Sequence, residues 1–172
     1  MKILLTFSAM AFAMAFSLQA EVSVKLSDVH LCCQSCVKGV QTAVGKVQGV
    51  TAKADKDEGT VTLTGPDGAT VQKGADALIA GGYFGKSSNE HIQIKASSGA
   101  TGKKVQSLRV EGVHLCCGKC VTAVNEALGK VPGVKANTAV KNAESFTVTG
   151  DFKDQDVFDA LQKAGLSGRA GK

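Results

Sequence analysis

The sequence predicts an α+β protein made of two tandem copies of one small domain, each with the order strand, helix, strand, strand, helix, strand. The duplication is visible in a cysteine cluster at 29–36 that returns at 113–120, an offset of 84 residues. The secondary structure is visible in the hydrophobic pattern, which alternates before each cluster and has helical spacing after it. Both observations place the start of a helix at each cluster.

The elements of the first copy follow from this pattern in chain order. Apolar and polar residues alternate over 22–26, which predicts a half-buried strand. Valines recur at helical spacing over 37–47, which predicts a helix with one face on a sheet. The remaining elements are expected as a hairpin of strands at 50–56 and 60–64 around Asp57-Glu58-Gly59, a helix at 71–80 that ends at Gly81-Gly82, and a last strand at 92–95. The second copy repeats this order from Gln106 to the C-terminus.

Two further segments set the expected domain boundaries. Residues 1–20 have a basic start, an apolar run and a small residue at the end, which is the pattern of a secretory signal peptide. Small, flexible residues without core positions fill most of 96–104, which predicts a linker. We therefore expect a first domain at 21–95, a second domain at 105–172, and a mature protein that is periplasmic or secreted.

The composition argues against several functions. The net charge of +5 over 172 residues is a weak basic excess, whereas a nucleic-acid binder would show a denser basic stripe with interleaved aromatic residues. After the first 20 residues no run approaches the roughly 18 apolar residues of a membrane span, so we expect no membrane insertion. No catalytic triad or phosphate-binding glycine loop is present, which favours a protein that is not an enzyme.

All six cysteines of the chain lie in the two clusters. Each cluster delivers three thiols from five consecutive positions at a helix N-terminus, and the dipole of the helix favours the thiolate form that binds metals. Such ligands select soft metal ions. The expected metal ligands are Cys32, Cys33, Cys36, Cys116, Cys117 and Cys120, with His30 and His114 as additional candidates.

The number of ligands decides which metal ion is expected. Two or three sulfurs suit Cu(I), which we favour, and Hg(II) also accepts few soft ligands. A third sulfur makes Cd(II) tolerable, and a histidine as fourth ligand would bring Zn(II) into contention. The sequence leaves open whether the two clusters form separate sites or one shared cluster that bridges several ions.

Thiol–disulfide exchange is the main alternative function. Cys33 and Cys36 form a Cys-x-x-Cys pair at a helix N-terminus, which is also the arrangement of a reactive redox couple. Three cysteines per copy argue against it, because disulfides within a domain always leave one thiol unpaired. Only a bridge between domains or between chains would use the last pair, so a dimer through a disulfide or a bridging metal is also left open.

The two clusters resemble the heavy-metal-associated domains of copper chaperones, of copper-pump N-terminal modules and of the periplasmic mercury-binding protein. The signature of that family is Gly-Met-Thr-Cys-x-x-Cys between the first strand and the first helix. The aligned segments here are His30-Leu31-Cys32-Cys33-Gln34-Ser35-Cys36 and His114-Leu115-Cys116-Cys117-Gly118-Lys119-Cys120. The resemblance implies a ferredoxin-like βαββαβ sandwich for both copies, and a carrier or scavenger of metal ions.

The same alignment separates shared positions from unusual ones. The glycine and the threonine of the family signature are replaced here by histidine and cysteine in both copies, which adds candidate ligands, and leucine replaces the buried methionine. The resemblance also implies transfer by ligand exchange with a metal-donor or metal-acceptor protein, without release of free ion. The two metal-ligand positions of the family are occupied by Cys33 with Cys36, and by Cys117 with Cys120.

Overall fold

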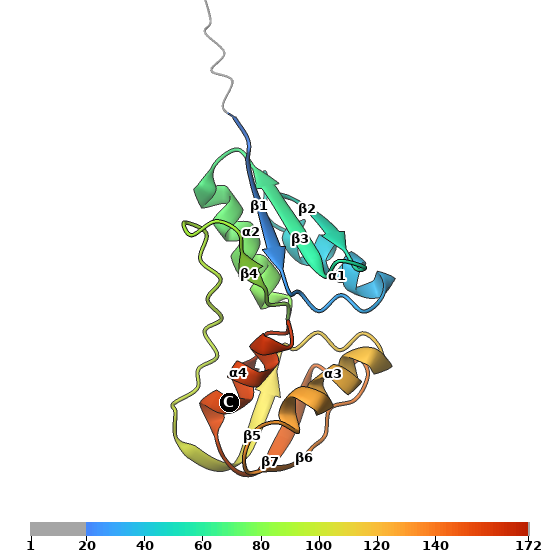
Figure 1. Ribbon diagram of the computed structural model, residues 1–172, viewed down its shortest axis with the longest axis vertical. Coiled ribbons are helices and arrows are strands. Elements are labelled where there is room, and N and C mark those ends of the chain that lie inside the picture. The colour runs from blue at the N-terminus through green and yellow to red at the C-terminus, as the bar shows by residue number, and fades with distance from the viewer. Residues whose placement is uncertain (1–19, 172) are drawn as a thin grey trace, which may run out of the picture.

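The computed structural model describes residues 20–171 as two halves that meet end to end (Figure 1). The signal peptide expected at 1–20 lies, except for Ala20, outside the described residues. The first half contains β1 (Val22–Ser27), α1 (Gln34–Val44), β2 (Thr51–Asp55), β3 (Thr60–Gly65), α2 (Gly68–Ala80) and β4 (Lys86–Ser87). The second half contains β5 (Lys104–Glu111), α3 (Gly118–Leu128), β6 (Val134–Asn137), β7 (Ser145–Lys153), α4 (Asp154–Lys163) and β8 (Arg169–Ala170).

Each half is one antiparallel four-stranded sheet with two helices. The strand order is β2-β3-β1-β4 in the first sheet and β6-β7-β5-β8 in the second. With the element order βαββαβ, this is the ferredoxin-like topology, so the predicted α+β fold of two tandem sandwiches is confirmed. No helix within residues 20–171 is both long enough and apolar enough to cross a membrane.

The cores form where the hydrophobic pattern places them. The side chains of Val24 and Leu26 on β1 are fully buried and alternate with exposed polar ones, as a strand with one face on a core requires. Helix α1 buries the face that carries Cys36, Val40 and Val44. Because Cys36 belongs to this buried face, the packing of α1 on its sheet also fixes the position of a candidate ligand.

The strand predicted at 92–95 is wrong. The edge strand is instead β4, which pairs with β1 through Leu26 and Ser87. Helix α2 ends at Ala80, and the tight turn through Gly81 and Gly82 returns the chain to the edge of the sheet at once. Ile92 is buried, but it packs as a single apolar side chain of a loop and not as part of a strand.

The segment expected to be a flexible linker is held against the second half. The carbonyl of Ser98 accepts a hydrogen bond from the backbone N–H of Ala170 at 2.7 Å. The backbone N–H and the hydroxyl of Thr101 both donate to the carboxylate of Asp154, at 2.7 and 2.9 Å. Small residues that lack core positions therefore find backbone and hydroxyl partners here, and the segment is ordered by hydrogen bonds.

Equivalent turns of the two halves dock against each other. Tyr83 and Leu166, which follow α2 and α4, form an isolated antiparallel bridge. The N–H of Ser167 donates to the carbonyl of Gly82 at 3.0 Å, and the N–H of Phe84 donates to the carbonyl of Gly165 at 3.1 Å. These reciprocal bonds relate the halves by an approximate twofold axis. The loops that carry the two cysteine clusters lie next to this axis.

Candidate metal centre

The two cysteine loops reach the same place because of the direction of the strands before them. The arrows of β1 and β5 both point toward the junction of the halves (Figure 1), and each loop directly follows one of these strands. The loop of the first half is fixed by the N–H of His30, which donates to the carbonyl of Gly165 in the second half at 3.2 Å. The sheet topology therefore delivers both clusters to one interface.

Each cluster spans the N-terminus of a helix. Cys33 and Cys117 are the N-cap residues of α1 and α3, and neither thiol makes a capping hydrogen bond. Cys36 and Cys120 lie in the first helical turn and are fully buried, whereas the other four cysteines are half-buried. The site thus has two sulfurs at its base and four that are closer to solvent.

The six sulfurs form a single group across the interface. Cys32 Sγ lies 3.3 Å from Cys117 Sγ, and the equivalent pair, Cys33 and Cys116, is 3.6 Å apart. Cys36 Sγ lies 3.5 Å from Cys116 Sγ and 4.0 Å from that of Cys120. The distances between halves are as short as the distances within a half, which are 3.7 and 3.8 Å.

The arrangement of the sulfurs is a distorted octahedron. Nine Sγ pairs lie 3.3–4.0 Å apart. Three more pairs lie within 4.8 Å, namely Cys32 with Cys33, Cys33 with Cys117, and Cys116 with Cys117. Together these pairs are the edges of an octahedron, in which Cys32 is opposite Cys116, Cys33 opposite Cys120, and Cys36 opposite Cys117. All six cysteines are free thiols.

The spacing of the sulfurs suits a metal centre. With metal–thiolate bonds of about 2.3 Å, two sulfurs on one metal ion stand about 3.8 Å apart in tetrahedral geometry and about 4.0 Å apart in trigonal geometry. The distances from Cys36 Sγ to the sulfurs of Cys32, Cys33 and Cys120 are 3.7, 3.8 and 4.0 Å. Little movement of the side chains would be needed to accept an ion.

The site stabilises thiolate charge. Hydrogen bonding from the Cys120 thiol, with smaller contributions from His114 and Cys116, lowers the pKa of Cys36 to about 2 against the opposing effect of burial. The pKa of Cys120 is raised in turn, since it holds the shared proton. Burial opposes ionisation of Cys117, but the backbone N–H groups of Cys120 and Lys119 and the side chain of Cys32 lower its pKa to about 6. The metal-free site therefore already holds a sulfur in the form that binds metal ions.

The two histidines lie beside the sulfurs. A ring nitrogen of His30 is within 4.8 Å of the sulfurs of Cys32 and Cys120, so the His30 ring reaches a cysteine of the opposite half. The Nε2 atoms of His30 and His114 are both buried and have no hydrogen-bond partner among the described residues. Burial lowers the pKa of His30, which keeps its imidazole neutral at neutral pH and able to act as a ligand or as an N–H donor.

Tyr83 is a residue of the site that the sequence analysis missed. Its buried ring stacks on the His114 imidazole at a centroid distance of 4.6 Å, and its hydroxyl donates to the carbonyl of Cys36 at 3.0 Å. The equivalent residue in the second half is Leu166. The only signal in the sequence was that Tyr83 is the single tyrosine of the chain, placed directly after Gly81-Gly82.

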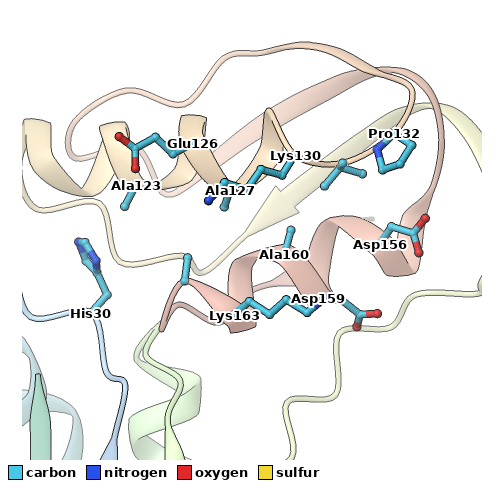
Figure 2. A pocket seen from close by; sticks show the side chains of 12 residues that line it. His30, Ala123, Glu126, Ala127, Lys130, Pro132, Asp156, Asp159, Ala160 and Lys163 are labelled. Atoms are coloured by element: carbon cyan, nitrogen blue, oxygen red, sulfur yellow. The ribbon is translucent and has the colours of Figure 1, made fainter.

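The two histidines therefore have different surroundings. His114 lies under the Tyr83 ring, whereas His30 lies at one end of a groove between α3 and α4 (Figure 2). Small side chains form the floor of this groove and charged ones form its rim. The lining includes Ala123, Ala127 and Ala160, with Glu126, Lys130, Asp159 and Lys163 around them.

Comparisons with known proteins give structural similarities only. No family model and no curated protein matches the chain. The N-terminal domain of PacS from Synechocystis PCC6803 is 26% identical over 40% of this chain and 100% of that one, with a TM-score of 0.37. A copper binding domain from HMA7, a P-type ATPase, is 21% identical over 40% of this chain and 96% of that one, also with a TM-score of 0.37.

One similar structure contains more than one domain. The N-terminal soluble domains of Bacillus subtilis CopA are 17% identical over 90% of this chain and 96% of that one, with a TM-score of 0.32. The fold assignment of this protein rests on its own strand order and not on these values.

Proposed function

We propose that this protein is an exported, non-enzymatic member of the heavy-metal-associated type that binds Cu(I) through cysteine thiolates and exchanges it with a partner protein. The observation that carries the proposal is the convergence of six sulfurs from both halves at spacings that suit metal coordination. The proposed location, in the periplasm or outside the cell, comes from the signal-peptide pattern of residues 1–20.

The donor set favours Cu(I) over harder ions. Thiolates are soft ligands, and no carboxylate is among the groups of candidate ligands in the described part of the chain. Zn(II) normally takes four ligands, and Cd(II) and Hg(II) would compete for the same sulfurs. Cu(I) is satisfied with three sulfurs, which the faces of the octahedron supply without further residues.

Ligand exchange would begin at the half-buried sulfurs. A thiolate of the partner would form a bond to an ion at the rim, and the bond from that ion to Cys33 or Cys117 would break. Cys36 and Cys120 are fully buried at the base and would keep their bonds until the end of the transfer. The ion would stay bound to sulfur throughout, so no free ion would be released.

The test is a titration of the reduced mature protein with Cu(I) under nitrogen, against a chelator that competes for the ion. Tight binding that is lost in the double variant Cys33→Ser with Cys117→Ser supports the proposal. Gln41→Ser, which introduces the same residue on the exposed face of α1, is the control and should bind as the wild type does.

The same samples test the redox alternative. If the wild type loses copper to the chelator at once, and its thiols instead cycle between dithiol and disulfide while reducing a disulfide substrate, the carrier proposal is overturned. The shared arrangement of the sulfurs argues against this result, because Cys36 lies as close to the sulfur of Cys116 as to that of Cys33. No Cys-x-x-Cys pair is isolated from the other thiols.

A further inference from the structure

We infer that the two halves hold one cluster of four Cu(I) ions, in which all six thiolates act as bridges. The inference rests on the proposed function and deepens it, because it replaces a two-sulfur site in each domain with one site that neither domain can form alone. It is carried by the octahedral arrangement of the six sulfurs.

An octahedron has eight triangular faces, and four alternate faces together use each corner twice. Four three-coordinate ions on such faces would therefore leave no thiolate unused and none with more than two metal bonds. One such set of faces is Cys32-Cys36-Cys120, Cys33-Cys36-Cys116, Cys32-Cys33-Cys117 and Cys116-Cys117-Cys120. Three of these four faces contain sulfurs from both halves, and each sulfur of the fourth, Cys116-Cys117-Cys120, also belongs to one of those three.

The distances argue against separate two-sulfur sites. Linear coordination of one ion by two thiolates requires sulfurs about 4.6 Å apart, twice a bond of about 2.3 Å. Cys33 and Cys36 are 3.8 Å apart, as are Cys117 and Cys120, which is too short for a linear site and close to the edge of a three-coordinate one. Cys33 and Cys36 take their third sulfur from Cys116 of the opposite half.

The charge balance also favours several ions. Six thiolates without metal would place six negative charges in one half-buried site, which is strongly unfavourable. Four Cu(I) ions reduce the total to two negative charges. The N-termini of α1 and α3 both end at the cluster, through Cys33 and Cys117, and their dipoles compensate part of the remainder.

The first measurement is native mass spectrometry of the full mature chain during the Cu(I) titration in the presence of the competing chelator. We expect four ions per chain, with the metal-free and four-ion forms dominant during loading. X-ray absorption of the loaded protein should show three sulfur neighbours per copper and nearby copper neighbours. Two ions per chain, each with two sulfurs, would overturn the cluster and leave the proposed function standing.

Single substitutions distinguish one shared cluster of four ions from independent sites in the two halves. Each sulfur belongs to two of the four faces, so Cys33→Ser should reduce the chelator-resistant copper from four ions to two or fewer. Cys117→Ser, at the equivalent position in the other half, should have the same effect, and Gln41→Ser should leave four. If Cys33→Ser instead removes one ion of two and leaves the other half unaffected, the sites are independent. If no variant and no wild type holds copper against the chelator, the proposed function itself has failed.

Discussion

The ring of Tyr83 stacks on the imidazole of His114, although the two residues belong to different halves of the molecule. The Tyr83 hydroxyl also donates to the carbonyl of Cys36, so one side chain joins α2, the first turn of α1 and the cysteine loop of the second half. The equivalent Leu166 has no such hydroxyl. The approximate twofold symmetry of the cluster is therefore broken by the residues that cover it.

We expect Tyr83→Phe to lower the free energy of unfolding by about 1 kcal/mol, because it removes one buried hydrogen bond and keeps the stacking. Tyr83→Leu, which copies Leu166, should lower it by about 2–3 kcal/mol because a cavity replaces part of the ring. Urea unfolding followed by circular dichroism measures both. Equal effects of the two variants would show that the ring does not contribute to the interface.

His30→Ala should keep the number of copper ions unchanged and weaken their affinity by roughly 10-fold to 100-fold. The reason is that the six sulfurs complete the coordination, while the His30 ring lies beside Cys32 and Cys120 and can donate a hydrogen bond to a bridging sulfur. Chelator competition measures the affinity, and His91→Ala, at an exposed position, is the control. Loss of an ion in His30→Ala would instead identify His30 as a ligand.

Gly82→Ala should separate the halves. Gly82 has φ +90, and an added Cβ would collide with the backbone of Gly112 and His114 in the opposite half. Strain and collision together should lower the free energy of unfolding by more than about 3 kcal/mol. The variant should also bind fewer copper ions. Gly102→Ala is the matched control, because Gly102 has φ +72 with nothing within 4 Å of the added atom.

Gly102→Ala, the control, should lower the free energy of unfolding by only about 1–2 kcal/mol, because a residue with a Cβ is strained in a left-handed conformation. Small-angle X-ray scattering of the metal-free variants measures the separation directly. An unchanged radius of gyration and full copper loading in Gly82→Ala would contradict the interface described here.

The sequence was sufficient to predict the fold, but not to predict that the two cysteine clusters meet at one interface. The alternation over 22–26 and the helical spacing over 37–47 depend on local geometry, and the structure follows both patterns. The meeting of the two clusters depends on Gly82 and Gly165 docking against loops of the opposite half of the chain. No local pattern encodes that contact.

The strand at 92–95 was predicted wrongly and the role of Tyr83 was missed for similar reasons. Ile92 and its neighbours carry apolar residues at strand-like spacing, but the edge of the sheet is already occupied by the short strand β4, which the turn after α2 delivers first. Tyr83 follows two glycines and resembles an ordinary turn residue. Its role comes from the opposite half, which supplies His114 as a partner.

Asp154→Asn should lower the free energy of unfolding at neutral pH by about 1–2 kcal/mol. Burial raises the pKa of Asp154, but the two hydrogen bonds from Thr101 outweigh it, so the pKa is lowered overall. The folded pKa is below the unfolded value of about 3.9, so the stabilisation is present above that pH and is lost as pH falls through the folded pKa. The wild type and the variant should therefore converge in acid, as measured by urea unfolding of the metal-free protein across pH.

Asp151→Asn is the control for this prediction. Asp151 pairs with Lys104 at 3.1 Å, but both side chains are 66% exposed, so removal of that charge should change the stability by less than about 1 kcal/mol. A pH dependence as large in Asp151→Asn as in Asp154→Asn would show that overall charge, and not the bond to Thr101, is responsible.

Removal of copper should lower the unfolding temperature of both halves together, and the two halves should still unfold in a single transition. An ion that binds only the folded protein stabilises it by about 4 kcal/mol when its free concentration is 1,000 times the dissociation constant. Because three of the four proposed three-sulfur faces contain sulfurs from both halves, and the fourth shares its sulfurs with those three, this stabilisation applies to the pair of domains and not to one of them. Thermal unfolding by circular dichroism, with and without the chelator, should give a single transition that moves to higher temperature with copper. Copper that shifts only part of the signal, while the rest unfolds as in the metal-free protein, would mean that the ions are held within one half.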